Sequence, residues 1–178
     1  MREAGKSETE APALAVAETA AGWVGLVFSA RGLMALRYPR PSRVEALDIL
    51  RAEWPDAPEL ADSAWSEVKE QLRRYYAGER VRFTVPLDLS RHTDFQRRVW
   101  EATCRIPYGE TRSYGWVAEE IGSPKAYRAV GAALAANPLP IIIPCHRVLC
   151  SDGSLGGYGG GLDMKRCLLV LEKGLGGK

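Results

Sequence analysis

Apolar and polar positions in the first half of the chain predict a small unit of strands and helices. Residues 23–38 (WVGLVFSARGLMALRY) contain two short apolar runs around an Ala-Arg-Gly turn, which predicts a β-hairpin. Residues 42–54 have helical spacing, and residues 59–77 repeat it through Leu60, Ala64, Val68, Leu72 and Tyr75. Residues 81–89 alternate like a strand, in which a proline indicates a sheet edge or a bend.

After residue 90 the pattern becomes that of short helices. Thr93 and Gln96 have the spacing of a capping box, in which each side chain satisfies a free backbone amide of the other residue. One apolar stripe follows and predicts a helix that stops at Pro107-Tyr108-Gly109. The stripe consists of Phe95, Val99, Ala102 and Ile106.

The next two helices are predicted from their caps. Ser113 is placed to cap a short helix that runs to Ile121 and is ended by the following glycine. Ser123-Pro124 predicts the start of another helix, with serine as N-cap, which runs to about Asn137. Two short helices joined by a tight turn that contains glycine have the layout of a helix-turn-helix.

The second of these helices has two different faces. Tyr127, Val130 and Leu134 share a face that we expect to point inward. Lys125, Arg128, Ala132 and Ala135 share another, where small side chains allow another molecule to approach the backbone. This face offers few groups that read base edges, so the pattern favours recognition by shape or by one inserted side chain. The structural alternative for Arg128 is a solvated side chain on an alanine-rich helix.

Residues 141–147 (IIIPCHR) bring a thiol, an imidazole and a guanidinium directly after an apolar run. The β-branched run predicts a buried strand that ends at the proline. A thiolate is the nucleophilic form of cysteine, and a neighbouring base or cation activates it. Neighbouring side chains of an extended chain point to opposite faces, so Cys145 and His146 need a bridging water or a bend at Pro144. The alternative is a structural cysteine beside an ordinary histidine.

A final helix is predicted at about Leu162–Lys173, with Met164, Leu168 and Leu171 on its core face and Cys167 beside them as inert packing. Glu172 lies in its last turn, where the helix dipole disfavours an anion, which makes it a candidate to orient His146. The alternative is a surface glutamate screened by Lys173. The glycine-rich segment 156–161 lacks the features of a P-loop, and we expect it to form a flexible turn or a wall against a flat ligand.

Composition and charge narrow the function classes. The 178 residues are 46% hydrophobic and 26% charged, which suits one domain or two small ones and excludes a disordered or fibrous chain. The net charge of +2 excludes a DNA binder that relies on bulk charge. Residues 1–90 hold 12 basic and 14 acidic side chains, and residues 91–178 hold 12 and 8. The attraction for phosphate therefore lies in the second half.

The N-terminal segment and the cysteines indicate a soluble intracellular protein. Acidic residues interrupt any signal-peptide layout, and no apolar run approaches a membrane span. These residues are Glu3, Glu8, Glu10 and Glu18. Without a CxxC pair, and with only two histidines, neither a disulfide framework nor a structural zinc site is expected. Besides Cys145, we expect Cys104, Cys150 and Cys167 to be packing residues.

Residues 92–173 resemble the O6-alkylguanine–DNA alkyltransferases, also called methylated-DNA–protein-cysteine methyltransferases. The resemblance rests on IPYGETRSY (106–114), SPKAYRAVGAALAANP (123–138), PIIIPCHRV (140–148), GYGGG (157–161) and Glu172. The first half is similar only in length and general α/β pattern. The resemblance implies a two-domain α/β (α+β) fold. Residues 1–90 would form a supporting domain with a small sheet and helices, ribonuclease H-like in the family. Residues 91–178 would form a winged helix-turn-helix-like domain that carries the active cysteine.

The resemblance also implies an activity: direct-reversal DNA repair by irreversible, single-turnover transfer of an alkyl group from O6-alkylguanine, and from O4-alkylthymine, with base flipping. Cys145 would accept the alkyl group, His146 would act as base through a water, and Glu172 would orient His146. Tyr114 would turn the target nucleotide by crowding its phosphate, and its hydroxyl is a candidate donor to the departing guanine. Arg128 would fill the gap left in the duplex.

The remaining implied residues fall into two sets. The DNA-binding set is Ser113, Tyr114, Lys125, Ala126, Arg128, Ala129 and Asn137, the last of which would also brace the turn before the active site. The guanine-pocket set is Pro140, Leu155, Gly156, Gly157, Tyr158, Gly159 and Gly160. The implied partner is the minor groove of double-stranded DNA, bound by a monomer without cofactor or metal. The expected location is the cytoplasm at the nucleoid, or the nucleus in a eukaryote.

The chain departs from this family at two points. Gly159 stands where many relatives carry a serine, so only its backbone amide can donate to the base oxygen. The zinc ligands that some relatives have in the N-terminal domain are missing. Two alternatives remain: a non-enzymatic helix-turn-helix regulator or lesion sensor, and a hydrolase that uses Cys145, His146 and Glu172 and turns over. Since relatives that only sense lesions lack the cysteine, Cys145 favours repair.

Overall fold

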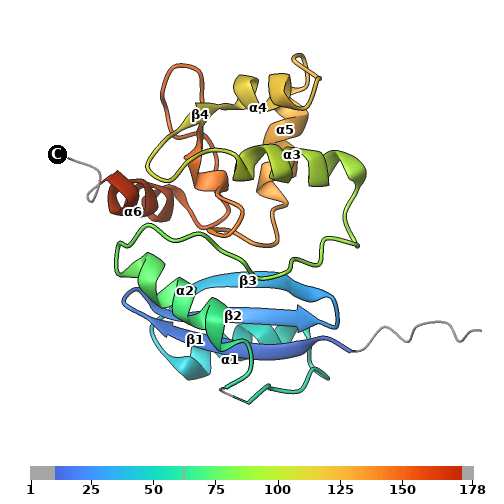
Figure 1. The fold of residues 1–178 in the computed structure, drawn as a ribbon, viewed down its shortest axis with the longest axis vertical. Helices are drawn as coiled ribbons and strands as arrows, with labels where there is room; N and C mark the ends of the chain where they lie inside the picture. The colour runs from blue at the N-terminus through green and yellow to red at the C-terminus, as the bar shows by residue number, and fades with distance from the viewer. Residues whose placement is uncertain (1–10, 62, 174–178) are drawn as a thin grey trace, which may run out of the picture.

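The computed structural model describes residues 11–61 and 63–173, and it has a small antiparallel sheet at one end and a group of helices at the other (Figure 1). This confirms the expected mixed α/β fold. Three of the four acidic residues noted near the N-terminus, Glu3, Glu8 and Glu10, lie outside the described residues. Within the described ranges, no helix is both long and apolar enough to cross a membrane.

The sheet has the strand order β1-β2-β3, formed by Ala13–Thr19, Gly22–Ser29 and Gly32–Arg40. The predicted hairpin is β2 and β3, whose antiparallel pairing includes Ser29 with Gly32. Because successive side chains point to opposite faces of a strand, the two faces are buried against different helices. Leu14 and Val16 lie in the cluster that α1 covers, whereas Ala15 and Ala17 lie in the cluster on the α2 side.

The helix predictions in the first half were confirmed in one case and partly wrong in the other. Helix α1 spans Arg43–Glu53, and Ser42 caps it by accepting from the Glu45 amide. Helix α2 spans only Ser66–Tyr76, so the prediction of a helix from residue 59 was wrong. The segment before α2 pairs with β1 instead: the Leu14 amide donates to the Pro58 carbonyl at 2.8 Å, and the Leu60 amide donates to the Leu14 carbonyl at 2.7 Å.

The strand predicted at residues 81–89 was also wrong, although its alternating exposure was correct. Only an isolated bridge between Leu33 and Leu87 forms there. The Leu33 amide donates to the Pro86 carbonyl at 2.8 Å, and the Asp88 amide donates to the Leu33 carbonyl at 2.8 Å. The proline lacks a donor, so it limits this segment to brief contacts with the edge of β3.

The second half contains the expected series of short helices. They are α3 (Asp94–Cys104), α4 (Tyr114–Glu120), α5 (Tyr127–Ala135) and α6 (Leu162–Lys173), with the single 3-10 turn η1 at Cys145–Arg147. Two-residue strands β4 (Arg112–Ser113) and β5 (Val148–Leu149) pair in parallel. The capping box is present at the start of α3, and Ser113 caps α4.

Helix α5 begins three residues later than its sequence predicts. Ser123–Ala126 forms a turn closed by the Ala126 amide on the Ser123 carbonyl at 2.8 Å, and Ala126 stands as an N-cap without a side-chain bond. Ser123 therefore closes a turn rather than capping the helix. The helix ends at Ala135, close to the predicted Asn137.

The two halves share one core. The largest cluster of buried residues takes side chains from the sheet, α2, α3, α4, α5 and the segment around Cys145. The Leu36 amide of β3 donates to the Pro138 carbonyl at 2.9 Å, and the Tyr108 hydroxyl donates to the Gly78 carbonyl at 3.3 Å. The first half is thus packed directly beneath the loops that carry the Cys-His-Arg segment (Figure 1).

Candidate active site

The segment that leads into Cys145 is a tight turn, so the prediction of a buried strand at 141–143 was wrong. Asn137 braces the turn: its Oδ1 accepts from the Leu139 amide and its Nδ2 donates to the Ile143 carbonyl, both at 2.9 Å. The Ile143 amide donates to the Leu139 carbonyl at 2.8 Å. Ile141 has φ 77°, a left-handed conformation that costs a β-branched residue roughly 1–3 kcal/mol. Apolar burial of the three isoleucines offsets that cost.

Cys145 begins η1 and is only 7% exposed. Asn137 Nδ2 donates to its sulfur at 3.1 Å. Burial raises the pKa of the thiol, while the hydrogen bond from Asn137 and the charge of Lys165 act in the opposite direction. Cys145 is therefore a protonated thiol at rest, held in a fixed position, and it becomes a nucleophile when a base takes its proton.

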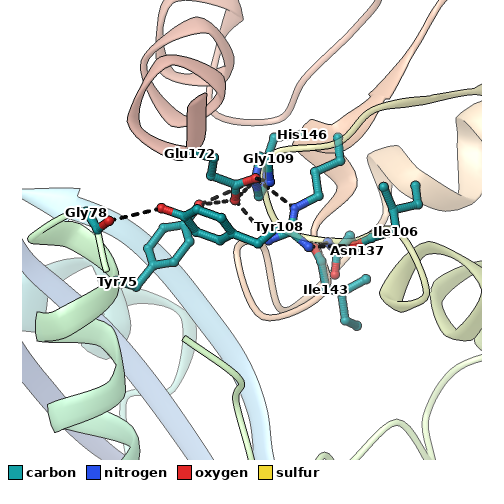
Figure 2. Close-up of polar contacts among 10 residues, drawn as sticks. Tyr75, Gly78, Ile106, Tyr108, Gly109, Asn137, Ile143, His146 and Glu172 are labelled. Atoms are coloured by element: carbon teal, nitrogen blue, oxygen red, sulfur yellow. Dashed lines mark hydrogen bonds and ion pairs between the residues drawn. The ribbon is translucent and has the colours of Figure 1, made fainter. Parts of the chain in front are cut away.

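His146, Arg147 and Glu172 form a buried charged cluster next to the cysteine. Figure 2 shows two of its members, His146 and Glu172, with the bond between them dashed. His146 Nε2 lies 2.7 Å from Glu172 Oε1. Arg147 donates to both carboxylate oxygens, at 2.9 Å from Nε and 3.0 Å from Nη2, and the Gly109 amide donates to Oε2 at 3.1 Å. Burial alone would raise the pKa of Glu172, but the hydrogen bonds from His146 and Arg147 lower it to about 2. Glu172 is thus a buried anion in the last turn of α6, and the hydrogen bonds from Arg147 and His146 compensate its charge.

The cluster determines the state of the histidine. Burial lowers the pKa of His146, against the attraction of Glu172, so the ring is neutral at neutral pH. An ionised carboxylate only accepts, so the ring proton is assigned to Nε2, which faces Glu172. His146 Nδ1 then carries the lone pair, and it has no hydrogen-bond partner in the described part of the chain. That nitrogen is a buried base available for a proton.

In front of Cys145 lies a cavity of about 380 Å³. Tyr114, Gly157, Tyr158 and Gly159 line it, as expected, whereas Pro140, Leu155, Gly156 and Gly160 do not. Three lining residues of α5 were missed: Gly131, Leu134 and Ala135. Their signal is in the sequence, because Gly131 and Ala135 lie three and seven residues after Arg128 and so share its face.

Lys165 of α6 is a second residue that the sequence analysis missed. It is fully buried, and its Nζ donates to the carbonyls of Val148 at 2.6 Å, Gly157 at 3.5 Å and Leu155. Burial lowers the pKa of its ammonium, and the nearby Cys145 and Cys150 act in the opposite direction. Lys165 thus ties the glycine-rich loop to the segment after Cys145. The sequence does contain a signal for its burial: Lys165 lies three residues before Leu168 and seven before Glu172, and therefore on the same face of the helix.

Four residues of α5 expected on its outer face are exposed, and so is Lys125 in the turn before it, whereas Ala126 is half-buried. The four are Arg128, Ala129, Ala132 and Ala135. Tyr127 was expected to point inward, but it is 50% exposed, and the Arg128 guanidinium lies 5.8 Å from its ring centre. Tyr127 is the first residue of α5, and its ring lies at the surface and not in the core. The Ser113 hydroxyl is used by the Trp116 amide. Asn137 likewise uses its amide inside the protein, which fits a brace rather than a DNA contact.

The other three cysteines are not buried packing residues. Cys104 and Cys167 are exposed and Cys150 is half-buried, so the expectation was wrong for them. Cys167 falls just outside the buried stripe of α6. Cys145 is thus the one buried thiol in the part of the chain that the structure describes.

Comparisons with known proteins show which family the chain is similar to. The model of the family "6-O-methylguanine DNA methyltransferase, DNA binding domain" matches residues 94–174. The methylated-DNA–protein-cysteine methyltransferase of Mycobacterium tuberculosis (strain ATCC 25618 / H37Rv) is 55% identical over 123 residues, which is 69% of this chain and 72% of that protein.

Solved structures extend the similarity to the first half. The crystal structure of the M. tuberculosis O6-methylguanine methyltransferase superposes with a TM-score of 0.76 and 45% identity, over 92% of this chain and 93% of that one. The M. tuberculosis OGT in complex with DNA gives 0.75 and 46%, over 90% and 92%.

Proposed function

The chain belongs to the family of methylated-DNA–protein-cysteine methyltransferases, and we propose that it repairs O6-alkylguanine in DNA by taking the alkyl group onto its own Cys145. One observation carries this proposal. Cys145 lines a cavity of about 380 Å³, and the next residue in the chain is a neutral histidine held by a buried glutamate. A flat base can enter the cavity, and the histidine can take the thiol proton.

The chemistry follows from the protonation states. The proton of Cys145 passes through a water to His146 Nδ1, and the resulting imidazolium is stabilised by Glu172. The thiolate attacks the alkyl carbon, a carbon–sulfur bond forms, and the carbon–O6 bond breaks with its electron pair on the guanine. Burial raises the pKa of Tyr114, so its hydroxyl keeps its proton at neutral pH and can donate it to the guanine anion. The product is a thioether, so each molecule acts once.

The second half carries the proposed DNA contacts. Helices α4 and α5, with the turn at Gly122 between them, act as a winged helix-turn-helix-like unit that enters the minor groove. Exposed alanines on α5 permit close approach, and Arg128 inserts where the base has left the stack. The target base must be flipped, because the lesion is hidden in the duplex. Tyr114, which lines the cavity beside α5, crowds the phosphate of that nucleotide.

We also propose the roles of the two domains, the oligomeric state, the location and a second substrate. Residues 91–178 form the DNA-binding and transfer domain, and residues 1–90 form a domain that supports it. The protein acts as a monomer, at the nucleoid in the cytoplasm or in a eukaryotic nucleus. O4-alkylthymine is a second substrate, since it presents the same kind of alkylated oxygen on a flat ring.

The deciding experiment mixes the protein with a duplex that contains one O6-methylguanine. Intact-protein mass spectrometry is expected to show a methyl group in place of one thiol hydrogen, mapped to the Cys145 peptide and absent from Cys145→Ser. Repeated turnover would support a hydrolase, and binding without a mass change would support a lesion sensor. Either result, with the lesion left intact in the second case, would overturn the proposal.

A further inference from the structure

Tyr75 is a fully buried residue of α2 that reaches from the first half of the chain into the charged cluster behind Cys145 (Figure 2). Its hydroxyl donates to Glu172 Oε1 at 2.7 Å and lies 3.3 Å from His146 Nε2. Tyr75 is 71 residues from His146 and 97 from Glu172 in the sequence. Among the polar groups of this cluster, it is the one supplied by the N-terminal half in the described structure.

The proton positions around this hydroxyl are determined by charge. Glu172 is ionised and can only accept, so the phenol must donate to it. The alternative, in which the phenol donates to His146 Nε2, would leave a nitrogen lone pair 2.7 Å from a carboxylate oxygen. That arrangement is repulsive, so the lone pair of the phenol oxygen faces the Nε2 proton. Both neighbours of Nε2 are then acceptors.

This arrangement has two consequences for the base. The imidazole is held with its proton on Nε2 and its lone pair on Nδ1, the state needed to take a proton from Cys145. The phenol also draws electron density from the carboxylate oxygen that faces the ring, so Glu172 stabilises the imidazolium less strongly than it otherwise would. Burial and the charge of Glu172 raise the pKa of Tyr75 well above its ordinary value, so the phenol stays a donor throughout the working pH range.

We propose that Tyr75 is a positioning residue for the alkyl transfer, which fixes the tautomer of His146 and limits its basicity through Glu172. The inference rests on the proposed function, in which His146 takes the thiol proton. It gives the N-terminal half a role in the chemistry beyond packing.

The neighbouring residue Tyr76 provides a matched control. It is also buried on α2, and its ring packs edge-to-face on Tyr75 with centres 5.5 Å apart. Its hydroxyl has no hydrogen-bond partner in the described residues. Tyr75→Phe and Tyr76→Phe therefore remove the same buried atom from neighbouring positions of α2, but only the first removes a bond to Glu172.

The test measures single-turnover transfer from free O6-benzylguanine as a function of pH, which avoids DNA binding. The charged and titratable groups that act on His146 are Glu172 and Lys165 from α6, Arg147 from η1, and Tyr75 from α2. All but Tyr75 are unchanged in Tyr75→Phe. We expect the acidic limb of the profile to move up by roughly one pH unit and the plateau rate to fall several-fold. Tyr76→Phe is expected to leave the limb in place.

A second measurement does not depend on activity. The chain has two histidines, so His92→Gln leaves His146 as the only one, and its ring nitrogens can be followed by 15N NMR. Protonation at Nε2 is expected, with a higher pKa for His146 after Tyr75→Phe than after Tyr76→Phe.

The outcomes separate the two proposals. A wild-type protein that takes up no alkyl group contradicts the proposed function. The role of Tyr75 is overturned if the wild-type protein reacts but Tyr75→Phe changes neither the acidic limb of the pH profile nor the pKa of His146. A lower plateau with an unmoved limb also overturns it, because loosened packing alone has that effect.

Discussion

Cys145 separates two environments that differ in charge, in shape and in the parts of the chain that build them. Behind the sulfur, His146 and Arg147 are buried, and both are bonded to the buried Glu172 at 2.7–3.0 Å. In front of it, the cavity is lined by a helix face of small residues, a glycine-rich loop and two tyrosines. The buried groups behind the sulfur set the charges and proton positions at the site, and the cavity in front of it sets the shape of the molecule that can enter.

This difference separates the two tasks of the protein. Charges behind the sulfur act on any alkyl donor, because they set the proton balance of Cys145 and His146. The front and the adjoining face of α5 decide which molecule reaches the sulfur. Changes behind Cys145 should therefore affect a free base and a duplex equally, whereas changes in front should affect them differently.

The largest effect is expected for Glu172→Gln. The substitution removes the charge that compensates Arg147 and stabilises protonated His146, and breaking a buried ion pair costs about 3–5 kcal/mol. The transfer rate should fall at least a hundredfold, by order of magnitude, both for a duplex and for O6-benzylguanine. Urea unfolding and single-turnover kinetics measure the two effects. Glu79→Gln, an exposed glutamate paired with Arg74, is the control. A loss confined to duplex DNA would contradict a role behind the sulfur.

Arg128→Ala should show the opposite pattern. This exposed side chain touches neither Cys145 nor the charged cluster, but in the proposed function it inserts into the duplex. Repair of a duplex should weaken by about 1–3 kcal/mol in transition-state stabilisation. Transfer from free O6-benzylguanine should be unchanged. Arg73→Ala, at an exposed position of α2, removes the same charge from the other half and serves as the control. An equal loss for both substrates would argue against base replacement.

Much of the front could be predicted from sequence because its signals are local. A cap and its helix lie within a few residues of each other, so Ser113 and the capping box at Thr93 predicted the starts of α4 and α3 correctly. The exposed face of α5 followed from helical periodicity. The start of the helix was harder to predict: Ser123 has the residue type of a cap, yet its carbonyl closes a turn and the helix begins only at Tyr127.

The charged cluster behind Cys145 was harder to predict, because its contacts join residues that are far apart in the sequence. The pairing of Glu172 with His146 was proposed because an anion in a last turn is unusual, but nothing near Tyr75 indicated that it reaches Glu172 across 97 positions. The isoleucine run misled for a related reason. Its β-branched composition favours a strand, but bonds from Asn137 hold it in a turn, and tertiary structure overrides propensity.

Acid should weaken the fold through the rear cluster. The pKa of Glu172 falls from 4.5 to about 2 in the folded protein, so its stabilisation is complete above 4.5 and is lost as the pH falls toward 2. The pKa of His146 is below 6.5 in the folded state, so the unfolded chain binds that proton first and stability also falls below about 6.5. Urea unfolding at several pH values should show both losses. In Glu172→Gln the loss below 4.5 should be smaller than in the wild type but not absent, because the pKa of Asp88 is also lowered to about 2. An unchanged loss would contradict the assignment.

The smallest effect is expected at the front, for Gly159→Ser. A Cβ atom there would lie 3.8 Å from the Tyr38 hydroxyl, an ordinary contact, so the fold should tolerate the serine. The new hydroxyl adds a donor at the cavity, and transfer from O6-benzylguanine should rise by about twofold to fivefold, the effect of one modest hydrogen bond. At Gly160 the same atom would lie 2.9 Å from the Tyr38 ring, so Gly160→Ser should lower the rate. Both variants are compared by single-turnover kinetics. If the two serines slow transfer equally, the room for a side chain at position 159 has no effect on the reaction. The cavity would then not act through its shape at this position.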